Sequence, residues 1–263
     1  MIIPGLVSIS FRQLTAEEII RMVGEAGLQG IEWGGDIHVP HGDLQRAAEV
    51  GDLTRQAGLQ VAAYGSYYRV GCNPVHGRSD AAEGPTFETV LATAVKLGAP
   101  TIRVWAGNKG SADADDAWWE RAVEDSLAIA DMAAREGISI SFEYHRNTLT
   151  DTAASASKLL RLCEHENINT LWQPSVDTND EERLESLRIV SPRLSNLHVY
   201  HWNMLERCPL RSGERQWRAY LVHAASLSGD RYALLEFVLN DSVEQFMEDA
   251  KTLRELLAEV NPA

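Results

Sequence analysis

Acidic and histidine side chains stand at the ends of several apolar segments. Glu143 follows the run Ile-Ser-Ile-Ser-Phe, Glu236 follows Tyr-Ala-Leu-Leu, and His198 follows Leu-Ser-Asn-Leu. A charge in such a buried setting is costly unless it is paired or binds a metal. Two carboxylates and an imidazole, with Gln173 between them in the sequence, are four candidate ligands for one divalent ion. Their oxygen-rich chemistry favours Mn²⁺, with Mg²⁺, Co²⁺ and Zn²⁺ as alternatives.

Polar and aromatic residues near the other segment ends are candidate substrate contacts. His145 is a candidate base, because an imidazole titrates near neutral pH, and orienting the substrate is its alternative role. For His38 and His41, substrate contact, loop structure and a second metal site all stay open. Aromatic rings stack on the C–H faces of sugars, so an aromatic wall favours a sugar or polyol substrate. The remaining predicted contacts are Glu32, Trp33, Tyr64, Tyr67, Trp105 and His201.

The composition narrows the class of protein. The chain has 263 residues and a formal net charge of −14, which would repel a phosphate backbone and argues against nucleic-acid binding. No run of about 18 apolar residues occurs, so we expect no membrane span. The start, Met-Ile-Ile-Pro-Gly-Leu-Val, is expected to begin the first strand and not a signal peptide. Three widely spaced cysteines indicate reduced thiols and a cytoplasmic location.

A repeated junction organises the chain into alternating strands and helices. Helical stretches end at Gly27, Gly58, Gly98 and Gly137, each followed by an apolar strand, and Asn167 holds the corresponding place in the next unit. Units of about 30–40 residues of this kind build parallel sheets. The predicted strands are about 6–11, 30–33, 60–65, 100–105, 138–143, 169–173, 195–200 and 231–238.

Eight such units predict a single (β/α)8 TIM barrel that spans residues 1–263 as one domain. An open doubly wound sheet is the alternative, but the chain has neither a GxGxxG nor a GxxxxGK[ST] motif. Thr15 to Glu18 and Ser242 to Gln245 are capping-box signatures at two helix starts. Active sites of such barrels lie where strands end and the following loops begin, so the candidate residues are expected to meet there.

The chain resembles the xylose-isomerase-like barrel superfamily of sugar-phosphate isomerases and epimerases over essentially its whole length. The segments that carry the resemblance are GIEWGGDIHVPHGD, SFEYHRNTLTDT, LWQPSVD, LSNLHVYHWN and LLEF. The resemblance implies metal ligands at Glu143, Gln173, His198 and Glu236. The family usually has Asp where this chain has Gln173, and Asp177 is a rival ligand. An arginine after the strand-7 histidine faces the substrate in the family, which implies Arg207, with Arg211 as a substitute.

The resemblance also implies a mechanism. A divalent ion stabilises an enediolate next to a carbonyl, and Glu143 and Glu236 act as base and acid on opposite sides of a sugar or polyol. The expected function is therefore a metal-dependent sugar isomerase or epimerase. A metal-dependent lyase or dehydratase, of the inosose-dehydratase or 3-keto-glycoside-cleaving type, is the close alternative. A barrel that only binds its ligand is a third possibility. An endonuclease is the least favoured reading, because the chain is acidic and has too few ligands for a trinuclear zinc site, and a homo-oligomer stays open.

Overall fold

Parallel strands form a closed barrel in the computed structural model, which describes residues 1–72 and 84–261. Around the barrel the strand order is β1-β10-β7-β6-β5-β4-β3-β2, which excludes an open doubly wound sheet. The strands are β1 (Ile2–Val7), β2 (Gly30–Gly34), β3 (Gln60–Arg69), β4 (Thr101–Trp105), β5 (Ser139–Phe142), β6 (Ile168–Trp172), β7 (Leu194–Val199) and β10 (Arg231–Leu235). The predicted (β/α)8 TIM barrel is therefore confirmed.

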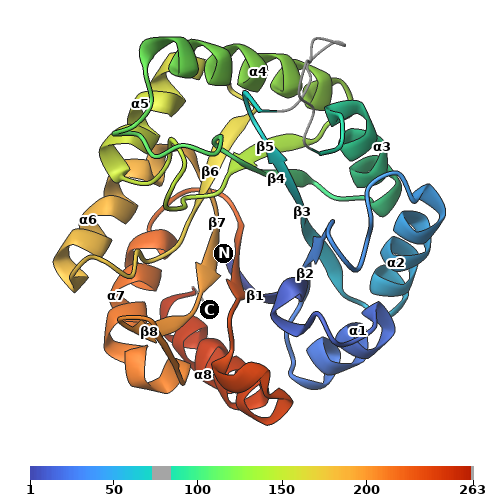
Figure 1. Ribbon diagram of the computed structural model, residues 1–263. Helices are drawn as coiled ribbons and strands as arrows, with labels where there is room; N and C mark the ends of the chain where they lie inside the picture. Colours follow the sequence, from blue (N-terminus) through green and yellow to red (C-terminus); the bar gives the residue numbers. More distant parts are fainter. Residues whose placement is uncertain (73–83, 262–263) are drawn as a thin grey trace.

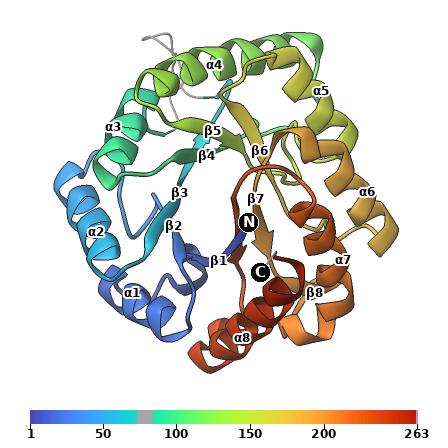
Figure 2. The same cartoon turned by 180° about the vertical axis from the view of Figure 1, so that it is seen from behind.

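Helices form an outer ring around the strands in both views (Figures 1 and 2). Those that follow the barrel strands are α1 (Ala16–Glu25), α2 (Leu44–Gln56), α3 (Phe87–Leu97), α4 (Asp116–Arg135), α5 (Ala153–Cys163), α6 (Asp180–Val190), α7 (Glu214–Ala225) and α8 (Val243–Val260). None of the helices in the described ranges is both long and apolar enough to cross a membrane.

The first strand lies four residues earlier than predicted. β1 contains Pro4 and Gly5, a pair that is typical of turns, while the predicted segment 8–11 forms a short 3₁₀ helix. A glycine is needed in this strand because a Cβ at Gly5 would lie 2.4 Å from the backbone oxygen of Gly30. Close approach of neighbouring strands therefore explains a residue that the local pattern treats as a turn.

Most helix ends follow the sequence prediction, with two exceptions. Thr15 and Glu18 form the complete capping box. Ser242 accepts a hydrogen bond from the backbone of Gln245, but the Gln245 side chain bonds Asp249, so only half of that box forms. Asn167 was also expected to adopt a left-handed conformation; that conformation falls on Glu164, with φ 38°.

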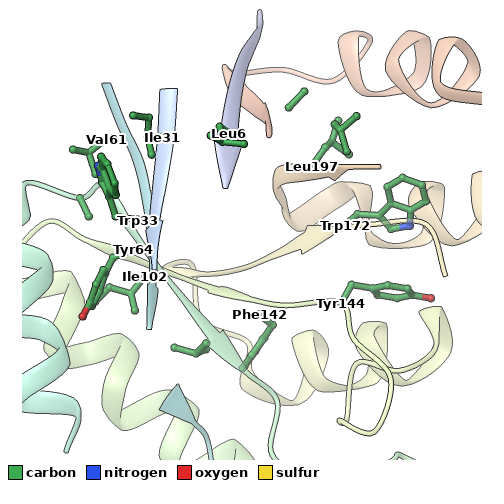
Figure 3. Close-up of a cluster of buried hydrophobic side chains, with 14 of the residues drawn as sticks. Leu6, Ile31, Trp33, Val61, Tyr64, Ile102, Phe142, Tyr144, Trp172 and Leu197 are labelled. Atoms are coloured by element: carbon green, nitrogen blue, oxygen red, sulfur yellow. The ribbon is translucent and has the colours of Figure 1, made fainter. Parts of the chain in front are cut away.

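Apolar side chains fill the layer between the barrel and its helices. Trp33 and Tyr64 are fully buried in this layer, so the prediction that they form a substrate wall is wrong. The Trp33 indole donates to the Thr54 hydroxyl at 3.2 Å, away from the barrel mouth. Figure 3 shows the layer around the ring of strands, with Leu6, Ile31, Trp33, Val61, Tyr64, Ile102, Phe142, Tyr144, Trp172 and Leu197 labelled.

A two-stranded hairpin that the sequence did not predict follows β7. It consists of β8 (His201–Asn203) and β9 (Glu206–Cys208), paired antiparallel. At its turn Met204 adopts φ 55°, and the side chains of Met204 and Leu205 are 79% and 71% exposed. The hairpin places its own side chains beside the loops that end the barrel strands.

The end of α8 is tied to the first strand, and the two lie near each other in Figures 1 and 2. The Asn261 side chain accepts from the Ile2 N–H and donates to the Ile2 carbonyl, both at 2.8 Å. This pair of hydrogen bonds links the end of α8 to β1, the strand that pairs with β10 to close the barrel.

We expect Asn261→Ala to lower the free energy of unfolding by about 1–2 kcal/mol, because two partly buried hydrogen bonds are lost. Urea unfolding followed by circular dichroism measures the effect. Asn108→Ala, in an exposed loop, is the control. Equal stabilities of the two variants would show that the tie contributes nothing.

Candidate functional site

Five charged residues lie inside the barrel at the carboxyl ends of its strands. Successive side chains of a strand point to opposite faces, and Ile102 and Val104, on either side of Arg103, belong to the outer apolar layer. The charged side chains therefore point toward the barrel interior. They are Glu32 on β2, Arg103 on β4, Glu143 after β5, His198 on β7 and Glu236 after β10.

These residues form one continuous chain of ion pairs. The Arg103 Nε lies 2.5 Å from Glu32 Oε1, and another nitrogen of the same guanidinium pairs with Glu143. The second Glu32 oxygen lies 3.1 Å from His198 Nε2, and His198 Nδ1 lies 3.3 Å from Glu236 Oε2. None of the five is more than 5% exposed. The two candidate acid–base residues, Glu143 and Glu236, thus lie at the two ends of this ion-pair chain.

The ion pairs shift the pKa values of the central groups. Burial opposes ionisation of Glu32, but Arg103 and His198 outweigh it and lower the Glu32 pKa to about 2. Burial likewise disfavours a charged His198, but Glu236 and Glu32 raise its pKa to about 10. The pKa of Arg103 rises despite burial because Glu143 and Glu32 surround it. At neutral pH, Glu32 is therefore ionised and His198 is protonated within the ion-pair chain.

A cavity of about 150 Å³ opens at this end of the barrel. Glu143, Gln173 and His145 lie on its wall, and the His145 ring stacks on Trp105 with 4.6 Å between ring centroids. The other residues on the wall are Tyr144, Arg146, Asp151, Pro174, Ser175, Val176, Asp177, Tyr200, Trp202 and Phe237. The cavity combines a buried carboxylate with aromatic and polar side chains, as expected for a small polar substrate.

Three buried atoms in this region suit a divalent ion. Gln173 Oε1 has no hydrogen-bond partner among the described residues, and His198 Nδ1 and Glu236 Oε2 have only their mutual ion pair at 3.3 Å. Buried polar atoms are normally satisfied, so the unpartnered Gln173 Oε1 and the long His198–Glu236 pair are consistent with a missing partner. Glu143, the fourth predicted ligand, pairs with Arg103 through one of its two carboxylate oxygens, and its ligand role stays a prediction. Within residues 1–72 and 84–261, no three His, Cys, Asp or Glu side chains group closely enough to hold a metal.

Gln173 and Asp177 occupy different environments. Gln173 is 6% exposed, and its Nε2 donates to the Tyr144 carbonyl at 2.9 Å, which leaves Oε1 free. Asp177 lies in the exposed loop that follows β6 and reaches the outer part of the cavity wall. Gln173 therefore suits a ligand role better than Asp177.

The predicted substrate contacts from the second strand lie outside the cavity wall. Glu32 uses both carboxylate oxygens within the ion-pair chain. The His38 ring is held by the Ser8 hydroxyl at 2.9 Å, and His41 Nδ1 lies 2.7 Å from the Tyr64 hydroxyl. Burial lowers the pKa of both histidines. These hydrogen bonds are consistent with the loop-structure role of His38 and His41, and substrate contact by either stays a prediction.

Tyr67, at the end of β3, lies next to the ion-pair chain. Its ring centroid is 5.0 Å from the Arg103 guanidinium carbon and 6.1 Å from the Trp105 ring. Its backbone has φ 55°, where β3 loses its regular register with β4. Substrate contact by Tyr67 and Trp105 stays a prediction, and their place beside Arg103 and His145 is consistent with it.

Residues predicted after the seventh strand do not line the main cavity themselves. His201 lines a smaller hollow beside Arg183. Arg207 donates to the Val238 carbonyl at 3.2 Å and pairs with Asp241, which directs it to the loop after β10. Its substitute Arg211 pairs with Glu214 and Glu255 on the surface. The side chain that this hairpin contributes to the cavity wall is Trp202, which the sequence did not single out.

The sequence also gave Arg103 no role. In the structure, Arg103 lies at the centre of the ion-pair chain and pairs with two glutamates. Its partners Glu32 and Glu143 are 71 and 40 residues away in sequence. The available signal was an arginine inside the apolar strand Thr-Ile-Arg-Val-Trp, which must find buried anions.

A family model described as xylose isomerase-like TIM barrel matches residues 20–257. The chain belongs to this family. Its members differ in activity. A curated relative from Bacillus anthracis, named 3-dehydroshikimate dehydratase, is 26% identical over 188 residues, which cover 67% of this chain. The match spans 65% of the length of that dehydratase.

Solved structures of the xylose isomerase-like family share the fold at low identity. D-psicose 3-epimerase from Clostridium cellulolyticum H10, solved with D-tagatose, superposes with a TM-score of 0.73 at 16% identity, covering 99% of this chain and 100% of that chain. A xylose isomerase-like TIM barrel protein from Mycobacterium smegmatis, solved in complex with magnesium, has a TM-score of 0.69 at 16% identity and coverages of 100% and 98%. The family resemblance is therefore confirmed, with epimerase and dehydratase relatives.

We expect Glu32→Gln to destabilise the fold by roughly 3 kcal/mol at pH 7. The Glu32 pKa is depressed to about 2 in the fold, so its contribution is complete above its unfolded pKa of about 4.3 and is lost as the pH falls toward 2. Urea unfolding at pH 7, 5 and 3.5 should show the gap between wild type and variant shrinking at low pH. Glu120→Gln, on the exposed face of α4, is the control. A gap that is independent of pH would contradict the ion-pair account.

Proposed function

We propose that this chain is an enzyme that removes and returns a proton at a carbon next to a carbonyl of a small sugar or polyol. One observation carries the proposal: two buried carboxylates, Glu143 and Glu236, enter the same barrel mouth from strands that β6 and β7 separate, and they are linked by one ion-pair chain. Paired carboxylates of this kind serve as base and acid when they face a substrate from two sides.

Glu143 is the better placed base because it lies on the cavity wall. It takes the proton from carbon while the C–H electron pair moves toward the carbonyl oxygen. A protonated Glu236 on the other side then returns a proton to the same carbon, which gives an epimer. Return of the proton to the former carbonyl carbon, with the proton of the adjacent hydroxyl moving to the former carbonyl oxygen, gives an isomer. His145, stacked on Trp105, would bond a substrate hydroxyl and so fix the orientation of the substrate.

Gln173, His198 and Glu236 are the residues that would hold a divalent ion, with Glu143 at the fourth family position. When bound, such an ion supplies Lewis-acid stabilisation of negative charge on a substrate oxygen. His198 must lose its proton to serve as a ligand, and Glu32 then accepts from its remaining N–H. Mn²⁺ remains the favoured ion, and the magnesium complex of the Mycobacterium smegmatis relative supports a hard cation.

A dehydratase is the second candidate, and the Bacillus anthracis relative supports it. Elimination starts with the same proton removal by Glu143. The electron pair then forms a carbon–carbon double bond, the carbon–oxygen bond at the next carbon breaks, and a protonated side chain gives its proton so that water leaves. His145 and Asp177 on the cavity wall are additional candidate acids for that step. Cytoplasmic location and assembly into a homo-oligomer stay predictions.

We expect the protein to exchange substrate C–H protons with solvent deuterium on a panel of ketoses, inososes and 3-dehydroshikimate. Proton NMR measures the exchange, and mass spectrometry of the products separates epimerisation from net loss of water. Glu143→Gln and Glu236→Gln should each lower kcat about 10²–10⁴-fold, because a general base or acid is removed. Glu206→Gln, on the exposed part of the hairpin, is the matched control. Full exchange in both variants would refute the assignment.

We also expect chelation to abolish turnover and added Mn²⁺ to restore it, because the unsatisfied ligand atoms would be filled again. The measurement is kcat after EDTA treatment and gel filtration, followed by titration with Mn²⁺, Mg²⁺, Co²⁺ and Zn²⁺. Unchanged activity in protein shown to be metal-free by elemental analysis would remove the metal from the mechanism and leave the carboxylate pair.

A further inference from the structure

We propose that Trp105 and Arg69 are positioning residues that hold the His145 ring at the cavity wall with its Nε2 as a hydrogen-bond acceptor. The substrate must then present a hydroxyl group, and not a carbonyl or ether oxygen, to this part of the wall. The inference rests on the proposed function, because it specifies how His145 selects the sugar or polyol. It places Trp105 behind His145, since His145 is among the described residues on the cavity wall and Trp105 is not.

An irregularity in β3 brings Arg69 against Trp105. Gly65 of β3 pairs with Arg103 of β4 in the regular register. The next pair is Arg69 with Trp105, so β3 advances four residues where β4 advances two. Regular pairing would place Tyr67 opposite Trp105, and the bulge puts Arg69 there instead. Bulges of this kind redirect side chains next to active sites.

Two groups pack against the Trp105 indole. The Arg69 guanidinium carbon lies 4.5 Å from the ring centroid. The His145 ring is nearly parallel to the indole, at an angle of 24° and with 4.6 Å between ring centroids. A cation over an indole is attracted by the ring quadrupole, and stacking of two aromatic rings is favourable in its own right. Arg69 therefore holds the indole, and the indole restricts rotation of the His145 ring.

The backbone of His145 is fixed by a turn that contains buried threonines. The Thr148 hydroxyl donates to the His145 carbonyl at 2.7 Å, and the Thr150 hydroxyl donates to the Glu143 carbonyl. Both threonines are fully buried, and Asn147 adopts φ 60° within the turn. One hydrogen-bonded turn thus holds both the candidate base and the imidazole, so their relative placement on the cavity wall is set by the fold.

The hydrogen bond of the ring decides which nitrogen is left for the substrate. His145 Nδ1 lies 2.7 Å from the Arg146 carbonyl oxygen. A carbonyl only accepts, so the neutral ring carries its proton on Nδ1 and has a lone pair on Nε2. Within residues 1–72 and 84–261, Nε2 has no hydrogen-bond partner. A substrate hydroxyl can donate to this lone pair, whereas a carbonyl or ether oxygen would leave two acceptors opposed.

Nitrogen-15 NMR of histidine-labelled protein tests this arrangement without any substrate. At about pH 8.5, above the range in which free imidazole titrates, we expect His145 to carry its proton on Nδ1, with His145→Gln used to assign its signals. The His145 Cε1 proton should move downfield in Trp105→Ala, because shielding by the stacked indole is lost, and Trp105→Phe should retain much of that shielding. A proton on Nε2 in the wild type, or an unchanged Cε1 proton in Trp105→Ala, would overturn the inference.

Deoxy substrates test the selection for a hydroxyl. The probe is the compound of the ketose, inosose and 3-dehydroshikimate panel that exchanges fastest with deuterium, compared with derivatives that each lack one hydroxyl. In the wild type, one derivative should lose about 10-fold or more in kcat/KM, because the His145 acceptor is left unpaired. That loss should shrink to about 2-fold in Trp105→Ala and return in Trp105→Phe. The same loss in wild type and Trp105→Ala for every derivative would contradict a positioning role.

A matched pair of variants tests the cation. Arg69→Met should weaken the selection for that hydroxyl by roughly 2–5-fold, the effect expected from loss of one cation–π contact. Lys158→Met removes a similar contact, 3.8 Å from the Trp119 ring centroid and outside the described cavity wall, and should leave the selection unchanged. Equal effects of the two variants would overturn the role of Arg69. If no compound of the panel exchanges, the proposed function fails, while the NMR measurement still decides how His145 is held.

Discussion

The pairing of Arg103 with Glu32 and Glu143 is the constraint on which the rest of the site depends. A buried guanidinium is tolerated only when anions surround it, and here they come from β2 and from the end of β5. Glu32 in turn fixes His198, and His198 approaches Glu236. One cation on β4 therefore orders carboxylates from three other parts of the barrel. The Glu32–His198 pair joins β2 to β7, which are not neighbours in the strand ring, so this link depends on closure of the barrel.

The barrel makes this possible through strand alternation and small residues. Each charged side chain points inward because its neighbours along the strand pack outward against helices. Space for the guanidinium depends on Gly65, and the close approach of β1 to β2 depends on Gly5. One glycine thus allows two strands to approach and another makes room for the charges, so the strand positions that close the barrel and those that shape the site both depend on the absence of a side chain.

The sequence was sufficient to predict the barrel and three of the inward-facing residues. Glu143, His198 and Glu236 stood out because a charge beside an apolar strand requires a partner. The start of the first strand was placed wrongly because Pro4 and Gly5 have the local chemistry of a turn, and tertiary contacts override it. The role of Arg103 could not be predicted because its partners are distant in sequence. The hairpin was missed for a different reason, since its strands have three residues each and carry no periodic pattern.

The ion-pair chain and the cavity wall of the site are built on different elements of the fold. The ion-pair chain is built on strands, whereas much of the cavity wall comes from residues on the loops after β5 and β6 and from Trp202 on the hairpin. Loops tolerate substitution and insertion far better than packed strands do. Changes in the length or residues of these connections can therefore retune which molecule is accepted while the proton-transfer apparatus stays intact, which is a physical basis for divergent substrates among barrels of one lineage.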